Sequence, residues 1–192
     1  MTKNRLEAFS DGVLAIIVTI MVLEIKVPHS ADLESLKPLT GIFISYVLSF
    51  VFVMIYWNNH HHLMHSVKHV NGRVLWANAH LLFWLSLLPF VSGWMGENHF
   101  ASLPVLAYAV VAFMAGLAYY LLSQALIQLH GKDSILAKAV GKDVKGIISA
   151  GLYFVAILVA CFYPMVSCGI FVLVAIIWLM PDKRIENVLN ND

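Results

Sequence analysis

Apolar stretches of membrane-spanning length dominate this sequence, and they leave it few possible folds. A helix needs about 20 mostly apolar residues to cross the ~30 Å hydrocarbon layer, because it must satisfy its backbone polar groups within itself. Proline residues mark several ends of these stretches. The predicted helices cover approximately residues 5–27, 39–60, 73–94, 104–129, 146–163 and 165–180. The sequence therefore predicts an all-α integral membrane protein, with six transmembrane helices in a single domain over residues 1–192.

The composition agrees with a protein embedded in a bilayer. Hydrophobic residues make up 60% of the chain and charged residues 12%, whereas soluble domains have about 45–50% and about 25%. So few charges cannot cover the surface of a soluble enzyme of this size. The net charge of +1 provides no basic field for phosphates, which excludes nucleic acid as a partner. The lipid bilayer is the partner that this composition predicts.

The distribution of Lys and Arg predicts the orientation, since short cytoplasmic loops carry the excess of these residues. With six spans, both termini lie on the same side as the second and fourth loops. Of the 12 Lys and Arg residues, only Lys26 and Lys37 fall on the opposite side. Both termini are therefore expected in the cytoplasm, and the expected location is the cell membrane, with several passes.

The first predicted helix is unusual because its uninterrupted apolar core, Gly12 to Leu23, is too short to cross the membrane. Such a core rises only ~18 Å. Arg5, Glu7 and Asp11 are therefore drawn toward the membrane, where charged groups normally face protein or water. This favours a central position for the helix, with a partner for Asp11 from another helix or subunit. Asn4 and Glu7 have the spacing of a capping box, which predicts the helix start.

A motif at the start of this helix carries a resemblance to a known family. The run Arg5-Leu-Glu-Ala-Phe9-Ser10-Asp11 has the pattern R-x-x-x-F-S-D. With the segments YWNNHHH, NGRVLWANAHLLFWLSLLP and IIWLMPDKRIE, it resembles the transmembrane protein 175 family of endolysosomal potassium channels and their bacterial homologues. The resemblance covers nearly the whole chain. One six-helix repeat is similar to the bacterial members, which implies a homotetramer in the bacterial inner membrane, with the first helix lining a central pore.

The resemblance implies a modestly potassium-selective cation channel, with passive K⁺ permeation and some proton leak, and no enzymatic activity. It implies no cofactor, and monovalent cations are the expected permeant partners. Narrow apolar rings can gate a pore by dewetting. The implied constriction consists of Ile16, Ile20 and Leu23, with Thr19 as a pore-adjacent hydroxyl for potassium preference. The implied signature network, which ties the first helix to the second and third, consists of Arg5, Phe9, Ser10, Asp11, Trp57, Asn58, His61, Asn78 and His80.

Periodicity alone leaves the role of the constriction residues open. Ile16, Ile20 and Leu23 follow the i, i+4, i+7 spacing of one helix face, and lipid contact would produce the same pattern.

The histidines support a competing interpretation. Of nine histidines, five crowd residues 60–69, and His61 and His65 have the i, i+4 spacing that lets two imidazoles share a metal. A membrane metal-binding protein or metalloenzyme using His60–His69 is therefore an alternative, although no H-E-x-x-H motif occurs and no metal is assigned. A secondary transporter is a further alternative, but the sequence lacks internal repeats and has few ionisable residues at the span centres.

Overall fold

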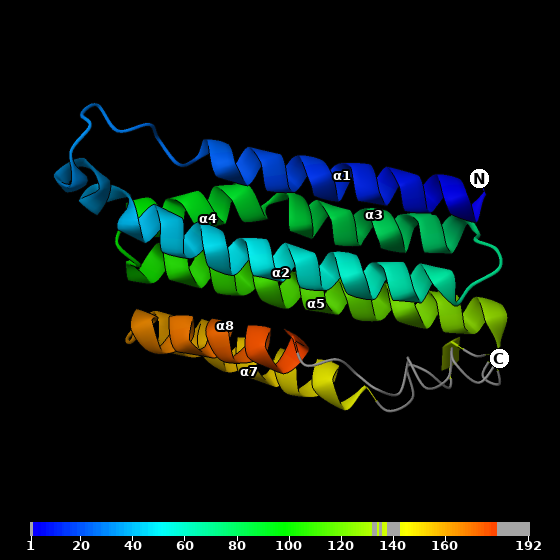
Figure 1. Ribbon diagram of the computed structural model, residues 1–192. Helices are drawn as coiled ribbons and strands as arrows, with labels where there is room; N and C mark the ends of the chain where they lie inside the picture. The colour runs from blue at the N-terminus through cyan, green and yellow to red at the C-terminus, as the bar shows by residue number, and fades with distance from the viewer. Residues whose placement is uncertain (1, 132–133, 135, 138–142, 180–192) are drawn as a thin grey trace.

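The computed structural model is all-helical and describes residues 2–131, 134, 136–137 and 143–179. Its long helices run side by side along one axis (Figure 1). A 3-10 helix, η1 (Leu33–Leu39), leads into the second long helix. The helices are α1 (Lys3–Leu23), α2 (Thr40–His65), α3 (Gly72–Ser86), α4 (Leu88–Glu97), α5 (Ser102–His130), α7 (Val144–Ala160) and α8 (Pro164–Leu179).

Over the described residues, these elements form six helical units, because α3 and α4 follow each other almost without interruption. Four units are long and apolar enough to cross a membrane: α1, η1 with α2, α3 with α4, and α5. The remaining two, α7 and α8, are apolar helices of 17 and 16 residues. The predicted all-helical, six-helix architecture is thus confirmed. The predicted sixth helix was placed as far as residue 180, which lies outside the described residues.

The start of α1 differs from the prediction. The helix begins at Lys3, and Thr2 occupies the N-cap position without a side-chain hydrogen bond. Asn4 therefore lies inside the first turn, where its backbone is already helical and its side chain cannot cap the helix. The predicted capping box is wrong, and the Glu7 carboxylate lies instead 3.5 Å from His61 Nδ1 of α2.

The third predicted helix is broken. Leu87 separates α3 from α4, because Pro89 lacks the N–H that would continue the hydrogen-bond ladder and its ring obstructs the carbonyl of Leu85. α4 then continues past the predicted end at residue 94, as far as Glu97. The break lies near the middle of the bundle's length, and both halves remain packed in the bundle (Figure 1).

α1 lies along one edge of the bundle, and the α7–α8 hairpin lies along the opposite edge (Figure 1). α1 packs on α2, α3 and α4, whereas α7 packs on α5 and α8. One face of α1 is buried against these neighbours, and the other is exposed. The central position predicted for this helix therefore requires further copies of the chain.

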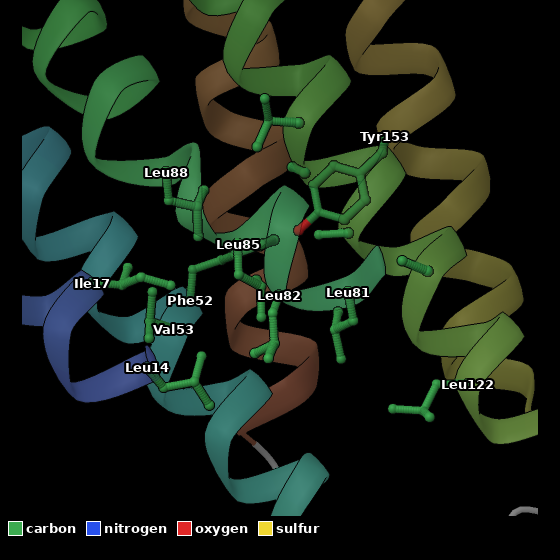
Figure 2. Packing of buried hydrophobic residues seen from close by; sticks show 14 of the residues in the cluster. Leu14, Ile17, Phe52, Val53, Leu81, Leu82, Leu85, Leu88, Leu122 and Tyr153 are labelled. Atoms are coloured by element: carbon green, nitrogen blue, oxygen red, sulfur yellow. The ribbon is translucent and has the colours of Figure 1, made fainter. Parts of the chain in front are cut away.

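Close packing of apolar side chains holds the helices together (Figure 2). Helix association within a bilayer relies on such packing and on small residues that let backbones approach, since lipid tails are as apolar as the side chains. α5 shows this directly, because Ala109, Ala112, Ala115 and Ala118 repeat every three residues and are all fully buried. The side chains labelled in the figure are Leu14, Ile17, Phe52, Val53, Leu81, Leu82, Leu85, Leu88, Leu122 and Tyr153.

Candidate functional site

A buried chain of polar side chains links α1, α2 and α3 near the N-terminal end of α1. Asn78 Nδ2 of α3 donates to Ser10 Oγ at 2.9 Å, and Ser10 Oγ donates in turn to the carbonyl of Leu6 at 2.9 Å. Asn78 Oδ1 lies 2.8 Å from His60 Nε2 of α2. All three side chains are almost completely buried. Unpaired polar groups are costly in such a setting, so these bonds fix how the three helices meet.

This chain also determines the hydrogen-bonding state of His60. With Asn78 Nδ2 donating to Ser10, Asn78 Oδ1 can only accept, so His60 Nε2 must carry the hydrogen. In the neutral ring, Nδ1 is then an acceptor, and it has no partner among the described residues.

A second set of polar contacts joins α1 to α2 at the surface. Trp57 Nε1 donates to Asp11 Oδ1 at 3.1 Å, and Glu7 faces His61 as described above. The Trp57 and His61 rings are stacked, with centroids 6.4 Å apart. Glu7 and Asp11 are like charges one turn apart on α1, which is unfavourable. Each of them faces its own side chain from α2, and the hydrogen bond from Trp57 to Asp11 offsets part of this repulsion.

The structure brings together only part of the predicted signature network. Ser10 and Asn78 meet in the buried chain, and Asp11, Trp57 and His61 meet at the surface. The other four predicted residues lie apart from these contacts. Arg5 and Asn58 are exposed and have no hydrogen bond or ion pair with described residues, Phe9 is exposed, and His80 accepts a hydrogen bond from Trp84 within α3.

Two residues of these contacts were missed from the predicted network: His60 and Glu7. In a run of three histidines, the sequence motif alone did not indicate which ring points inward. The signal was in the surrounding apolar spacing, because His60 lies seven residues after Val53 and four before Met64, and all three are buried. Seven and four residues return to the same face of a helix.

The residues predicted for the pore constriction lie on the exposed face of α1. Ile16, Ile20 and Leu23 are 58%, 43% and 76% exposed. Thr19 is exposed beside them, and its Oγ1 donates to the carbonyl of Ile16 at 2.8 Å. The hydrogen of this hydroxyl is therefore taken up by the backbone bond. Its oxygen keeps lone pairs that can face a cation or water.

The structure divides the histidine cluster. His60 is inside the bundle, and His61 and His65 lie at the surface with ring centroids 6.2 Å apart. His69 faces His130 of α5, at 4.7 Å between ring centroids. Among the residues that the structure describes, no three His, Cys, Asp or Glu side chains are arranged to hold a metal ion. The geometry therefore gives the metalloprotein alternative no support.

Fold and site together define the class of this protein. It is an all-helical, multi-pass membrane protein in which polar side chains hold one end of the first helix, while the outer face of that helix exposes an apolar stripe. The family model for the endosomal/lysosomal potassium channel TMEM175 matches residues 5–89, which contain the whole polar site. A Chryseobacterium sp. (strain P1-3) protein named as a potassium channel is 52% identical, and the match covers 100% of both chains.

Two further relatives extend the comparison. The crystal structure of a lysosomal potassium-selective channel TMEM175 homolog from Chamaesiphon minutus is similar with a TM-score of 0.79 and 28% identity, over 93% of this chain and 96% of that one. The endosomal/lysosomal proton channel TMEM175 of Gallus gallus is 27% identical, and the match covers 92% of this chain but 37% of the chicken protein. This chain belongs to the TMEM175 family, as its R-x-x-x-F-S-D motif predicts. It is therefore a member of a channel family and not an enzyme.

Proposed function

We propose that this chain forms a potassium-permeable cation channel. The observation that carries the proposal is the full-length, 52% identical relative named as a potassium channel. The similar structure from Chamaesiphon minutus, described as potassium-selective, supports it. K⁺ is the permeant ion of the proposed channel, and a potassium gradient drives passive flux. The chicken relative is named as a proton channel, which supports the expectation of some proton leak.

In the proposed channel, four copies of the chain surround a pore lined by α1. The exposed face of α1 supports this arrangement, because it carries Arg5 and Thr19 as well as large apolar side chains. Charged and polar groups at membrane depth favour water or protein over lipid. Ile16, Ile20 and Leu23 form apolar rings that close the pore by dewetting. Selectivity is modest, since no cage of carbonyl oxygens replaces the hydration shell of the ion.

The signature residues Ser10, Asp11, Trp57 and Asn78 hold the pore helix in this proposal. The whole chain is one channel unit with both termini in the cytoplasm of a bacterial cell, and α7 and α8 complete six spans. At ~26 Å, α7 is near the lower length limit of a spanning helix. Five of the basic residues that predict the orientation lie outside the described part of the chain: Lys132, Lys138, Lys142, Lys183 and Arg184.

Potassium flux into liposomes tests the proposal. Purified protein should produce flux well above that of empty vesicles, with less flux for Na⁺. Ile16→Ala should raise the flux severalfold, because a wider apolar ring is more easily wetted. Ile176→Ala is the matched control, since this isoleucine is also about half exposed and belongs to α8, on the edge of the bundle opposite α1 (Figure 1). Background flux from the wild type, or equal effects of the two variants, would contradict the proposal.

A further inference from the structure

An ion pair joins the segment after α1 to the last residue of α4. Lys26 Nζ lies 2.5 Å from Glu97 Oε1, although the two residues are 71 positions apart in the sequence. The hydrogen bond and charge of Glu97 raise the pKa of Lys26 above its ordinary value of 10.5, so the lysine stays charged at neutral pH. Lys26 follows Leu23, the outermost of the proposed constriction residues, by three positions.

A second contact at this end brings α1 close to the backbone of α4. Glu24 lies at the end of α1, and a Cβ atom built on Gly93 would be 3.1 Å from Glu24 Oε2. Gly93 is buried, and the absence of a side chain there leaves room for the glutamate. Glu24 and Lys26, one and three positions after Leu23, therefore both contact the final turns of α4.

A groove of about 570 Å³ lies between α1 and α4 and reaches these contacts, since Glu24, Gly93 and Glu97 are among its lining residues. Apolar side chains line most of it, including Ile16 and Ile20 of α1 and Phe90 and Trp94 of α4. The groove leaves part of the outer half of α1 open beside α4, although Ile17 and Met21 on this half remain buried. The contacts at Glu24 and Lys26 add to this packing at the end of α1.

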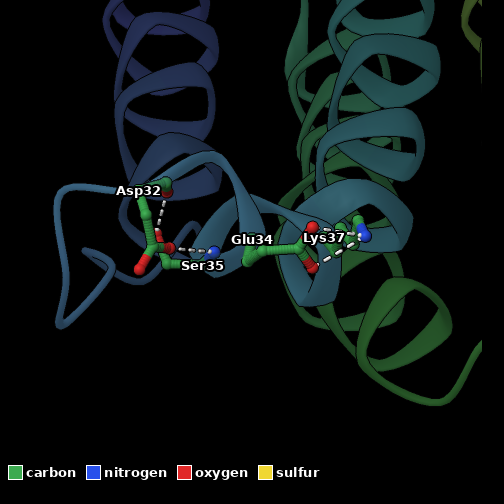
Figure 3. Close-up of polar contacts among 4 residues, drawn as sticks. All are labelled: Asp32, Glu34, Ser35 and Lys37. Atoms are coloured by element: carbon green, nitrogen blue, oxygen red, sulfur yellow. Dashed lines mark hydrogen bonds and ion pairs between the residues drawn. The ribbon is translucent and has the colours of Figure 1, made fainter.

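Another exposed ion pair on the same connecting segment provides a contrast. Lys37 lies 2.7 Å from Glu34 within η1, beside the Asp32 cap that accepts from the Ser35 N–H (Figure 3). Its lysine is as exposed as Lys26, at 72% against 73%. The Lys37 pair joins neighbours three residues apart, however, whereas the Lys26 pair joins the segment after α1 to the end of α4.

We propose that Lys26, Glu97 and the contact of Glu24 with Gly93 anchor the outer end of α1 on α4 and thereby position Leu23 in the ion path. This inference rests on the proposed pore and makes these side chains positioning residues for its outer constriction. The ion pair of the anchor is exposed to solvent, so its effect is modest. Loss of an exposed ion pair changes an equilibrium by about fivefold at most, and salt screens the attraction.

The test combines a structural readout with a flux readout, in a background without Cys161 and Cys168. The variant Leu23→Cys reports the exposure of this position through its rate of alkylation in liposomes. Adding Lys26→Gln or Glu97→Gln should raise the alkylation rate about two- to fivefold, and the same changes in a chain with Leu23 intact should raise K⁺ flux. The charge swap Lys26→Glu with Glu97→Lys should restore both values. Lys37→Gln is the matched control and should change neither.

The outcomes separate the anchor from the channel. If the wild type carries no K⁺ flux, the proposed function fails, while the alkylation rates still decide the anchor. The anchor would be overturned if Lys26→Gln and Glu97→Gln gave the same alkylation rate as Lys37→Gln. It would also be overturned if the charge swap restored neither the alkylation rate nor the flux. High salt gives a second measurement on the chain with Lys26 and Glu97 intact. It should raise the Leu23→Cys alkylation rate there and leave the rate in the Lys26→Gln variant unchanged; equal responses would also overturn the anchor.

Discussion

At the scale of single residues, one amide side chain links three helices. Asn78→Ala removes the partner of both His60 Nε2 and Ser10 Oγ in a buried setting. We expect a loss of about 1–3 kcal/mol in folding stability, because the histidine N–H is left buried and unpaired. The thermal midpoint of the purified protein in detergent measures this. Asn58→Ala is the matched control, since Asn58 is exposed and has no hydrogen bond to described residues; similar midpoints for the two variants would show that the buried chain contributes little.

The same two asparagines show what the sequence motif predicts for single residues and what it does not. The resemblance placed both in one network, because a motif identifies positions without showing which way each side chain points. The direction follows from packing across helices: Asn78 shares a buried face with Leu81, Leu82 and Leu85, whereas Asn58 shares no such face. Arg5, which begins the motif, has no partner within the described part of one chain, so any contact it makes involves residues outside that part, another copy, lipid or water.

At the scale of helices, two glycines determine how closely α2 and α4 approach. A Cβ atom on Gly96 would lie 2.6 Å from the Cα of Ile42 and 3.0 Å from the carbonyl oxygen of Gly41, both on the α2 backbone. Gly96→Ala should therefore destabilise the protein by about 1–3 kcal/mol, as overpacking does in well-packed interiors. Gly169→Ala of α8 is the control, because a Cβ atom there meets nothing within 4 Å. Thermal midpoints compare the two, and an unchanged midpoint for Gly96→Ala would indicate that the helices can separate without cost.

Hydropathy predicted the existence and order of these helices well, because length and apolar content are properties of each segment alone. It did not predict the break at Leu87 or the extension of α4 to Glu97. An apolar segment has the same hydropathy whether it is straight or broken, and the signal was the single residue Pro89 inside the predicted span. Hydropathy also did not predict that α1 ends at Leu23, because Ile25 and Val27 continue the apolar character beyond the helix.

At the scale of the whole molecule, the proposed pore cannot be seen in one chain. A symmetry axis is a relation between copies, so neither hydropathy nor the packing within a chain contains it. What one chain does show is that the two faces of α1 differ. One face is buried in the bundle, and the other exposes Phe9, Ile16 and Leu23. Lipid would accept the apolar side chains of this face, and Arg5 at its end can extend to the membrane surface. In the proposed channel, association of several copies through α1 would cover the same face.

Disulfide cross-linking tests this association directly. In a background without Cys161 and Cys168, oxidation of Ile20→Cys in the membrane should yield linked pairs of chains, because side chains around a narrow axis come within the ~7 Å between Cα atoms that a disulfide allows. Leu158→Cys on α7 is the control: Leu158 is also exposed, at 57% against 43% for Ile20, but lies on the opposite edge of the bundle (Figure 1). Native mass spectrometry should give four copies. If linked pairs form at Leu158→Cys and not at Ile20→Cys, the copies meet through the α7 edge, and α1 lines no shared pore.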